Sequence, residues 1–238
     1  MDNEATPKGL LLDYGGTLVE EVSFDPRAGN EALLARAVYK PAHIGIEQVL
    51  ARADRVSREL AERRDEFQIE TSWQTLTRLI HDFLGIRFAE PMAELEMAFW
   101  KASVTTAPMP GAREALEQFH RRGVRMGVVS NCAFSQDVLR YEFSKYGLTE
   151  WLEFIMVSAE YSVRKPNVLL FETAAAKLGL ACRDIWFEGD RLDTDIAGAK
   201  AAGMKAVWFQ PVDAGRQSSD ASILRVTSWK DLLDEIKS

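Results

Sequence analysis

Cysteine, net positive charge and long apolar runs are all scarce in this chain of 238 residues. Its two cysteines, Cys132 and Cys182, form neither a disulfide framework nor a metal-ligand spacing, so we expect structural thiols. The formal net charge of −7 and the lack of a basic stripe exclude an electrostatic surface for nucleic acid or anionic membrane. No apolar run approaches the roughly 18 residues of a membrane-spanning helix, and the first residues lack a leader pattern. We therefore expect a cytoplasmic protein whose partners include neither nucleic acid nor membrane.

Short apolar runs alternate with amphipathic helical segments over much of the chain. The runs predict buried parallel strands at residues 10–13, 124–130, 154–158, 185–190 and 206–209. Helical patterns occupy residues 112–122, 135–146 and 168–178, and each precedes a glycine at the expected C-terminal cap, namely Gly123, Gly147 and Gly179. This alternation with short connections predicts an α/β fold with a doubly wound parallel sheet.

The segment after the first strand differs, because it shows helical stripes and no comparable strand. The stripes cover residues 46–63, 73–84 and 91–101. They predict an inserted α-helical cap domain at residues 20–107, with the core domain formed by residues 1–19 and 108–238. Such an insert would roof the ligand crevice at the carboxyl edge of the sheet. At helical spacing, its aromatic residues are expected to pack in a core rather than line a pocket: Trp73, Phe83, Phe99 and Trp100.

Polar residues follow the ends of three predicted strands and precede one helix. Asp13 ends the first apolar run, and an unpaired carboxylate there needs a cation, donors or chemistry to compensate it. Asp190 and Asp195 follow the fourth run, where two carboxylates would repel without a divalent cation. Ser130-Asn131 and Lys165 hold the other two positions. Taken singly, each of these also fits a turn, a helix cap or a solvated charge.

Together and in this order, the four motifs resemble those of the haloacid dehalogenase superfamily, in the branch with a helical cap after the first motif. The resemblance covers essentially the whole chain. It rests on Asp13 with Thr17-Leu18, on Ser130-Asn131, on Arg164-Lys165-Pro166 and on the segment 189–203. It implies a Rossmann-like core and hydrolysis of a small phosphorylated metabolite by a monomer or homodimer.

The resemblance also implies roles for the residues that carry it. Asp13 would be the nucleophile and form an aspartyl-phosphate that water hydrolyses. Ser130 and the backbone amide of Asn131 would hold phosphoryl oxygens, and Thr17 would belong to the same substrate-binding set. Lys165 would neutralise charge on the nucleophile and on the transferring group.

A magnesium ion is the cofactor that the resemblance implies. Its ligands would be Asp13, the backbone carbonyl of Gly15 and Asp190, with Asp195 bound directly or through water. Asp193 would be a turn residue. Oxygen ligands in an octahedral arrangement suit this ion.

One position departs from the family pattern. Phosphatases of this superfamily carry a second aspartate two residues after the nucleophile, as general acid and base, and this chain has Gly15 there. General acid–base catalysis contributes about 10² to 10⁴-fold, so we expect a magnesium-dependent phosphohydrolase of reduced or specialised activity. Four residues are candidates to replace the acid: Glu20, Glu21, His43 and Glu188.

Three other functions compete with this interpretation. Hydrolysis of a carbon–phosphorus bond would need a Schiff-base lysine in the insert, which offers only Lys40 and Lys101. Hydrolysis of a carbon–halogen bond proceeds without metal in this superfamily, whereas Asp190 and Asp195 indicate a metal. A non-catalytic protein that binds a phosphorylated metabolite would not need the nucleophile Asp13.

Overall fold

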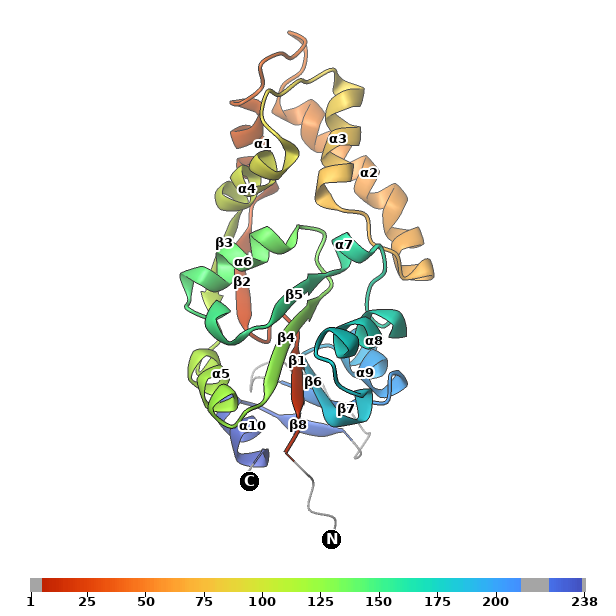
Figure 1. The fold of residues 1–238 in the computed structure, drawn as a ribbon. Coiled ribbons are helices and arrows are strands. Elements are labelled where there is room, and N and C mark those ends of the chain that lie inside the picture. The colour runs from red at the N-terminus through yellow and green to blue at the C-terminus, as the bar shows by residue number, and fades with distance from the viewer. Residues whose placement is uncertain (1–5, 211–222, 237–238) are drawn as a thin grey trace.

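The computed structural model describes residues 6–210 and 223–236. Within them, parallel strands form a six-stranded sheet in the order β5-β4-β1-β6-β7-β8 (Figure 1). The strands are β1 (Gly9–Leu12), β4 (Arg125–Ser130), β5 (Phe154–Val157), β6 (Ile185–Gly189), β7 (Lys205–Phe209) and β8 (Leu224–Val226). The chain adds strands on one side of β1 and then crosses to the other side, so β1 and β6 flank the reversal of strand order. The predicted doubly wound α/β fold is confirmed.

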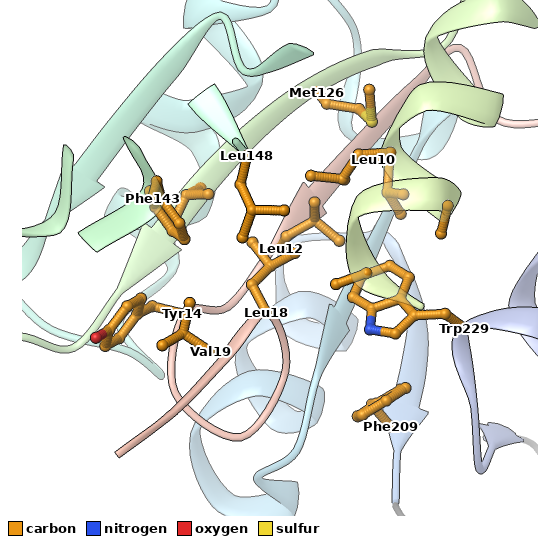
Figure 2. Close-up of a cluster of buried hydrophobic side chains, with 14 of the residues drawn as sticks. Leu10, Leu12, Tyr14, Leu18, Val19, Met126, Phe143, Leu148, Phe209 and Trp229 are labelled. Carbon is orange, nitrogen blue, oxygen red and sulfur yellow. The ribbon is translucent and has the colours of Figure 1, made fainter. Parts of the chain in front are cut away.

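Apolar side chains of β1 pack on both faces of the sheet. Leu10 and Leu12 join a cluster that Figure 2 shows together with Trp229, whereas Leu11 belongs to the cluster on the other face. The covering helices are α5 (Ala112–Arg121), α6 (Gln136–Lys145) and α10 (Trp229–Glu235) on the first face, and α8 (Val168–Lys177) and α9 (Ala197–Ala201) on the second. Burial on both faces explains why the strands appear in the sequence as continuous apolar runs.

In the sequence, four helices lie between the first strand of the sheet, β1, and the core helix α5. They are α1 (Pro26–Leu34), α2 (Ile46–Phe67), α3 (Trp73–Leu84) and α4 (Met92–Ser103), and Figure 1 shows them at the end of the molecule opposite α10. The three helices expected here are confirmed as α2, α3 and α4. The additional helix α1 begins at Pro26 and is capped by Asp25, whose Oδ1 accepts hydrogen bonds from two backbone amides.

This segment does contain strands, although none is comparable to the buried strands of the sheet, as expected. Strands β2 (Val19–Phe24) and β3 (Val104–Pro108) form an antiparallel pair through which the chain leaves the core and returns to it. Only Val19 of β2 is buried, so the pair lacks the apolar pattern on which the strand prediction depends. The division of the chain at residues 20 and 107 stays a prediction.

Aromatic packing joins the inserted helices to the core. Trp73 stacks on Phe134 with ring centroids 5.8 Å apart, and Trp100 meets the same ring edge-on at 4.8 Å. Phe99 packs against both Trp73 and Phe134, so these three inserted aromatic residues have the expected core role. Phe83 differs, because it is 64% exposed and lies under the guanidinium of Arg52.

Some short elements were not anticipated from the sequence: α7 (Ser158–Tyr161), β8 and α10. Glycines at the three expected helix caps adopt left-handed φ angles of 76°, 62° and 60°, at Gly123, Gly147 and Gly179.

Across residues 6–210 and 223–236, none of the helices is long and apolar enough to span a membrane. The residues 1–4, on which the expectation of no leader peptide depends, lie outside this part.

Candidate active site

A cavity of about 810 Å³ opens where β1, β4 and β6 end, next to the last turn of α2. Most of the predicted site residues line this cavity: Asp13, Gly15, Ser130, Asn131, Lys165, Asp190 and Asp195. Three loops that follow strand ends and the segment before α8 therefore converge on one place. This is the crevice that the reversal of strand order creates.

Lys165 is the centre of the buried charges. Its Nζ donates a hydrogen bond of 2.7 Å to Asp13 Oδ1 and one of 2.9 Å to the carbonyl of Val129, and it lies 2.7 Å from Asp195 Oδ1. The side chain of Asn131 holds the Lys165 peptide from both sides, donating to its carbonyl at 2.9 Å and accepting from its amide at 2.7 Å. Asn131 thus fixes the backbone from which the lysine side chain reaches Asp13.

Burial controls the protonation of this cluster. Burial by itself would lower the pKa of Lys165, but attraction to Asp13 and Asp195 outweighs it and leaves the pKa raised. Burial also raises the pKa of Asp13, and Lys165 offsets only part of that rise. The pKa of Asp195 is raised to about 6, first by burial and further by the charge of Asp13. The lysine therefore stays protonated, but its single positive charge does not fully stabilise the ionised forms of Asp13 and Asp195.

The same residues fit a divalent cation. Asp13, Asp190 and Asp195 each offer a carboxylate oxygen, and these oxygens lie within 4.8 Å of one another. Opposite ligands of octahedral magnesium are about 4 Å apart, since each bond is about 2.0–2.1 Å. Three carboxylates and one ammonium carry a net charge of −2, which a divalent ion would balance. A β-carbon at residue 189 would collide with the Asp195 carboxylate, so Gly189 permits its close approach.

The turn after β1 contains two glycines in different situations. Gly16 has a left-handed φ of 69°, and a β-carbon there would lie 3.1 Å from the carboxylate of Asp190. Gly15 does not have a left-handed φ, and a β-carbon at this residue would have no neighbour within 4 Å. Open space therefore adjoins residue 15 on the wall of the cavity.

The four candidates to replace the missing general acid differ in whether they lie at the cavity. Glu20 and Glu21 line the cavity, whereas His43 and Glu188 do not. Desolvation by the groups around it, followed by the nearby Glu142, raises the pKa of Glu21 above its ordinary value, although the side chain is exposed at the cavity. Glu188 is fully buried, neither of its carboxylate oxygens has a hydrogen-bond partner within residues 6–210 and 223–236, and burial raises its pKa well above the ordinary value.

Some residues singled out from the sequence lie away from the cavity. Thr17 is fully buried, and the structure does not bring it together with the other predicted substrate-binding residues. Lys40 donates to the carbonyl of Ile44, and Lys101 lies over the ring of Tyr141, so neither lines the cavity. Cys132 does line it, but burial raises the pKa of its thiol.

Sequence reasoning missed a group of charged and polar residues on the outer wall of the cavity. Arg64, Asp65 and Gln68 come from the end of α2, and Arg191 follows Asp190 directly. The sequence around Arg64 resembles any exposed helical surface. Its presence at the cavity depends on how α2 packs, which no local pattern reveals.

Comparisons with known proteins agree with this fold and its motifs. A family model described as haloacid dehalogenase-like hydrolase matches residues 63–209. A ribulose-1,5-bisphosphate 5-phosphatase from Halopiger xanaduensis is 30% identical over 126 residues, 52% of this chain and 50% of that protein. A phosphoserine phosphatase from Thermus thermophilus is 30% identical over 131 residues, 55% of this chain and 51% of that protein. The chain thus spans about half the length of these curated relatives.

Solved structures share the fold at low sequence identity. A 2-haloacid dehalogenase from Pseudomonas syringae pv. Tomato DC3000 has a TM-score of 0.66 and 17% identity, covering 95% of this chain and 96% of that one. A phosphatase from Thermococcus onnurineus has a TM-score of 0.58 and 17% identity, with the same coverage of both chains. At this identity the likeness concerns the fold alone, because dehalogenases and phosphatases share it.

Proposed function

We propose, from the premise that this chain belongs to the haloacid dehalogenase-like hydrolase family, that it is a magnesium-dependent phosphohydrolase of small phosphorylated metabolites. The observation that carries the proposal is the cluster of the buried Asp13, Lys165 and Asp195 with the half-buried Asp190 at the cavity. The phosphatase relatives support the reaction class. The net charge of −7 supports the lack of nucleic-acid and anionic-membrane partners, and we further propose that the protein acts in the cytoplasm as a monomer or homodimer.

The chemistry begins at Asp13. One of its carboxylate oxygens attacks phosphorus, the bond from phosphorus to the leaving oxygen breaks, and an aspartyl-phosphate forms. Water then attacks phosphorus, which releases phosphate and restores the carboxylate. Lys165 holds Asp13 in place and offsets negative charge on the transferring group, while Ser130 and the backbone amide of Asn131 offer donors to phosphoryl oxygens. A magnesium ion held by Asp13, the Gly15 carbonyl, Asp190 and Asp195 would supply further charge neutralisation.

The leaving oxygen needs a proton from another part of the site. Residue 15 has no side chain to provide one, and Glu21 is the cavity-lining carboxyl with a raised pKa outside the metal cluster. We assign it the role of general acid, which a carboxyl that stays protonated nearer neutral pH can perform. For the competing carbon–phosphorus hydrolysis, the cavity offers no lysine besides Lys165 within the described ranges.

The substitution Asp13→Asn tests the covalent mechanism. It removes the nucleophile at almost unchanged size, so turnover of p-nitrophenyl phosphate in saturating magnesium should fall at least about 10³-fold, while the melting temperature measured without magnesium stays close to that of the wild type. Asp193→Asn is the matched control, because Asp193 lines the same cavity but is 68% exposed and pairs with Arg191. Unchanged turnover in Asp13→Asn would exclude the aspartyl-phosphate.

A further inference from the structure

We propose that Arg64, Arg164 and Arg191 form a second oxyanion subsite on the outer wall of the cavity, so that the substrate carries another anionic group besides its phosphoryl group. The inference rests on the proposed function for the identity of the group that is cleaved. It goes further by naming the substrate class: small metabolites with two oxyanions, the second being a phosphate or a carboxylate.

The three arginines reach the cavity from three different parts of the chain. Arg64 lies in the last turn of α2, Arg164 directly precedes Lys165, and Arg191 directly follows Asp190. Arg164 and Arg191 are therefore adjacent in sequence to Lys165 and Asp190, which the proposed function places at the reacting group and its metal. A molecule bound at Asp13 would extend toward these guanidinium groups within a cavity of about 810 Å³, a size typical of small-molecule sites.

Arg164 is the best-anchored member of this subsite. Its backbone amide donates to the carbonyl of Gln68 at 2.9 Å, and its side chain is only 17% exposed. The Nη1 atom is buried and donates no hydrogen bond within the described part of the chain. Carboxylates of Asp65 and Glu70 flank Nη1 at 3.7 and 3.6 Å, too far for hydrogen bonds. Because Nη1 is enclosed, a ligand oxyanion would be bound by the remaining donors of the Arg164 guanidinium, which belongs to a residue that lines the cavity.

Mutual repulsion gives a second reason for an anion at this place. Burial lowers the pKa of Arg164, attraction to Glu70 and Asp65 offsets part of that lowering, and the charges of Arg64 and Arg191 add to it. An arginine does not lose its proton in a protein, so a ligand oxyanion would relieve the repulsion that remains among the three guanidinium groups. Guanidinium groups bind phosphate and carboxylate oxygens through paired, charge-assisted hydrogen bonds.

Arg64 and Arg191 are paired with carboxylates that a ligand could replace, whereas Arg164 lies beside the buried side chain of Glu70. Arg64 donates to Asp65 at 2.9 Å, and Arg191 lies 2.9 Å from Asp193. Both carboxylates are largely in solvent, at 66% and 68% exposure. Exposed ion pairs contribute about 0–1 kcal/mol, so a ligand oxyanion can replace them at little cost.

Binding to the turnover-free Asp13→Asn protein, measured by calorimetry in magnesium, tests the subsite. Two matched pairs of probes differ in the second anion: 3-phosphoglycerate against glycerol 3-phosphate, and fructose 1,6-bisphosphate against fructose 6-phosphate. We expect at least one doubly anionic probe to bind about tenfold tighter than its singly anionic partner. The pair that shows the preference identifies the second group as carboxylate or phosphate.

Variants in the same background assign the preference to the arginines. Arg164→Gln should bring the affinity ratio close to one while the singly anionic probe binds as before, and Arg64→Gln, on an exposed turn that tolerates substitution, should reduce it at least about threefold. Arg63→Gln is the matched control, since Arg63 is exposed on α2 and does not line the cavity. Equal affinities within both pairs, or a preference that survives both variants, would overturn the inference. Because binding is measured without turnover, a failure of phosphate-ester hydrolysis leaves this result interpretable.

Discussion

The turn after β1 contains two glycines, and only one of them is required by the local geometry. Gly16 has a left-handed φ and lies against Asp190, so its lack of a side chain follows from local geometry. Gly15 has neither constraint, since its backbone suits any residue and the space beside it is open. The missing side chain at residue 15 is therefore a chemical feature of the site and no requirement of the fold.

The substitution Gly15→Asp should restore an acid without loss of stability. An alkyl phosphate needs a proton on its leaving oxygen and an aryl phosphate hardly does, so the ratio of alkyl to aryl kcat/KM should rise at least about tenfold. The melting temperature should stay near that of the wild type, because the new β-carbon meets nothing within 4 Å. Gly16→Asp is the contrasting variant and should lower the melting temperature. A folded Gly15→Asp protein with an unchanged ratio would mean that protonation is not limiting.

The substitution Glu21→Gln tests the acid that we assign to the wild type. The pKa of Glu21 is raised, and an acid must be protonated to act, so wild-type kcat/KM for an alkyl phosphate should fall as pH rises through that pKa. In Glu21→Gln the rate should be about 10²-fold lower and this fall should disappear, while aryl phosphates change little. Glu20→Gln is the matched control on the same strand. An unchanged pH profile in Glu21→Gln would assign the proton to another group.

At the scale of elements, we could predict the strands and helices whose burial produces a regular spacing of apolar residues in the sequence. Strands of the sheet bury both faces, and α2 to α4 bury one stripe, so both appear in the sequence. The β2–β3 pair is held by its own hydrogen bonds and exposes most side chains of β2, which leaves no such pattern. The helix α1 did carry a signal, Asp25-Pro26 at its start, that could have predicted it.

Part of the candidate site could likewise be predicted from the sequence, and part of it could not. Asp13, Ser130 and Asp190 follow strand ends, and parallel strands bring their carboxyl ends to one edge, so their convergence could be predicted. The bracing of the Lys165 backbone by Asn131 and the approach of Arg64 depend on packing between distant segments. Such contacts are set by tertiary structure and have no local sequence pattern.

Glu142 joins α6 of the core to the inserted segment, and Glu142→Ala should weaken that connection. Its buried carboxylate accepts hydrogen bonds from Trp100 Nε1 of α4, Thr106 Oγ1 of β3 and Lys145 Nζ. Their loss should lower the free energy of unfolding by about 2–3 kcal/mol in denaturant titrations, since hydrogen bonds to charged groups contribute about 1.5–3 kcal/mol. Glu117→Ala, which removes an exposed pair with Arg121, should cost less than about 1 kcal/mol. Equal effects of the two variants would contradict this role for Glu142.

At the scale of the whole molecule, an acidic protein is proposed to bind an acidic substrate. The net charge of −7 would repel a phosphate at long range, so attraction must come from local groups. In the proposed function, Lys165 and a divalent cation would supply this attraction at the base of the cavity, and the three arginines would supply it at the outer wall. Binding should therefore depend on magnesium as well as on the chain itself, because the carboxylate cluster alone is negative.

Magnesium should raise the melting temperature of the whole chain, because only the folded state brings Asp13, Asp190 and Asp195 together. An ion present at a hundred times its Kd contributes about 2.7 kcal/mol, equivalent to roughly 5–10 °C for a chain of this size. Asp190→Ala should abolish the shift, whereas Asp193→Ala should keep it. The pKa of Asp195 is raised to about 6, so protons compete with the ion and the shift should shrink between about pH 7 and about pH 5. A wild-type melting temperature that ignores magnesium at neutral pH would favour metal-free chemistry at Asp13 over phosphoryl transfer.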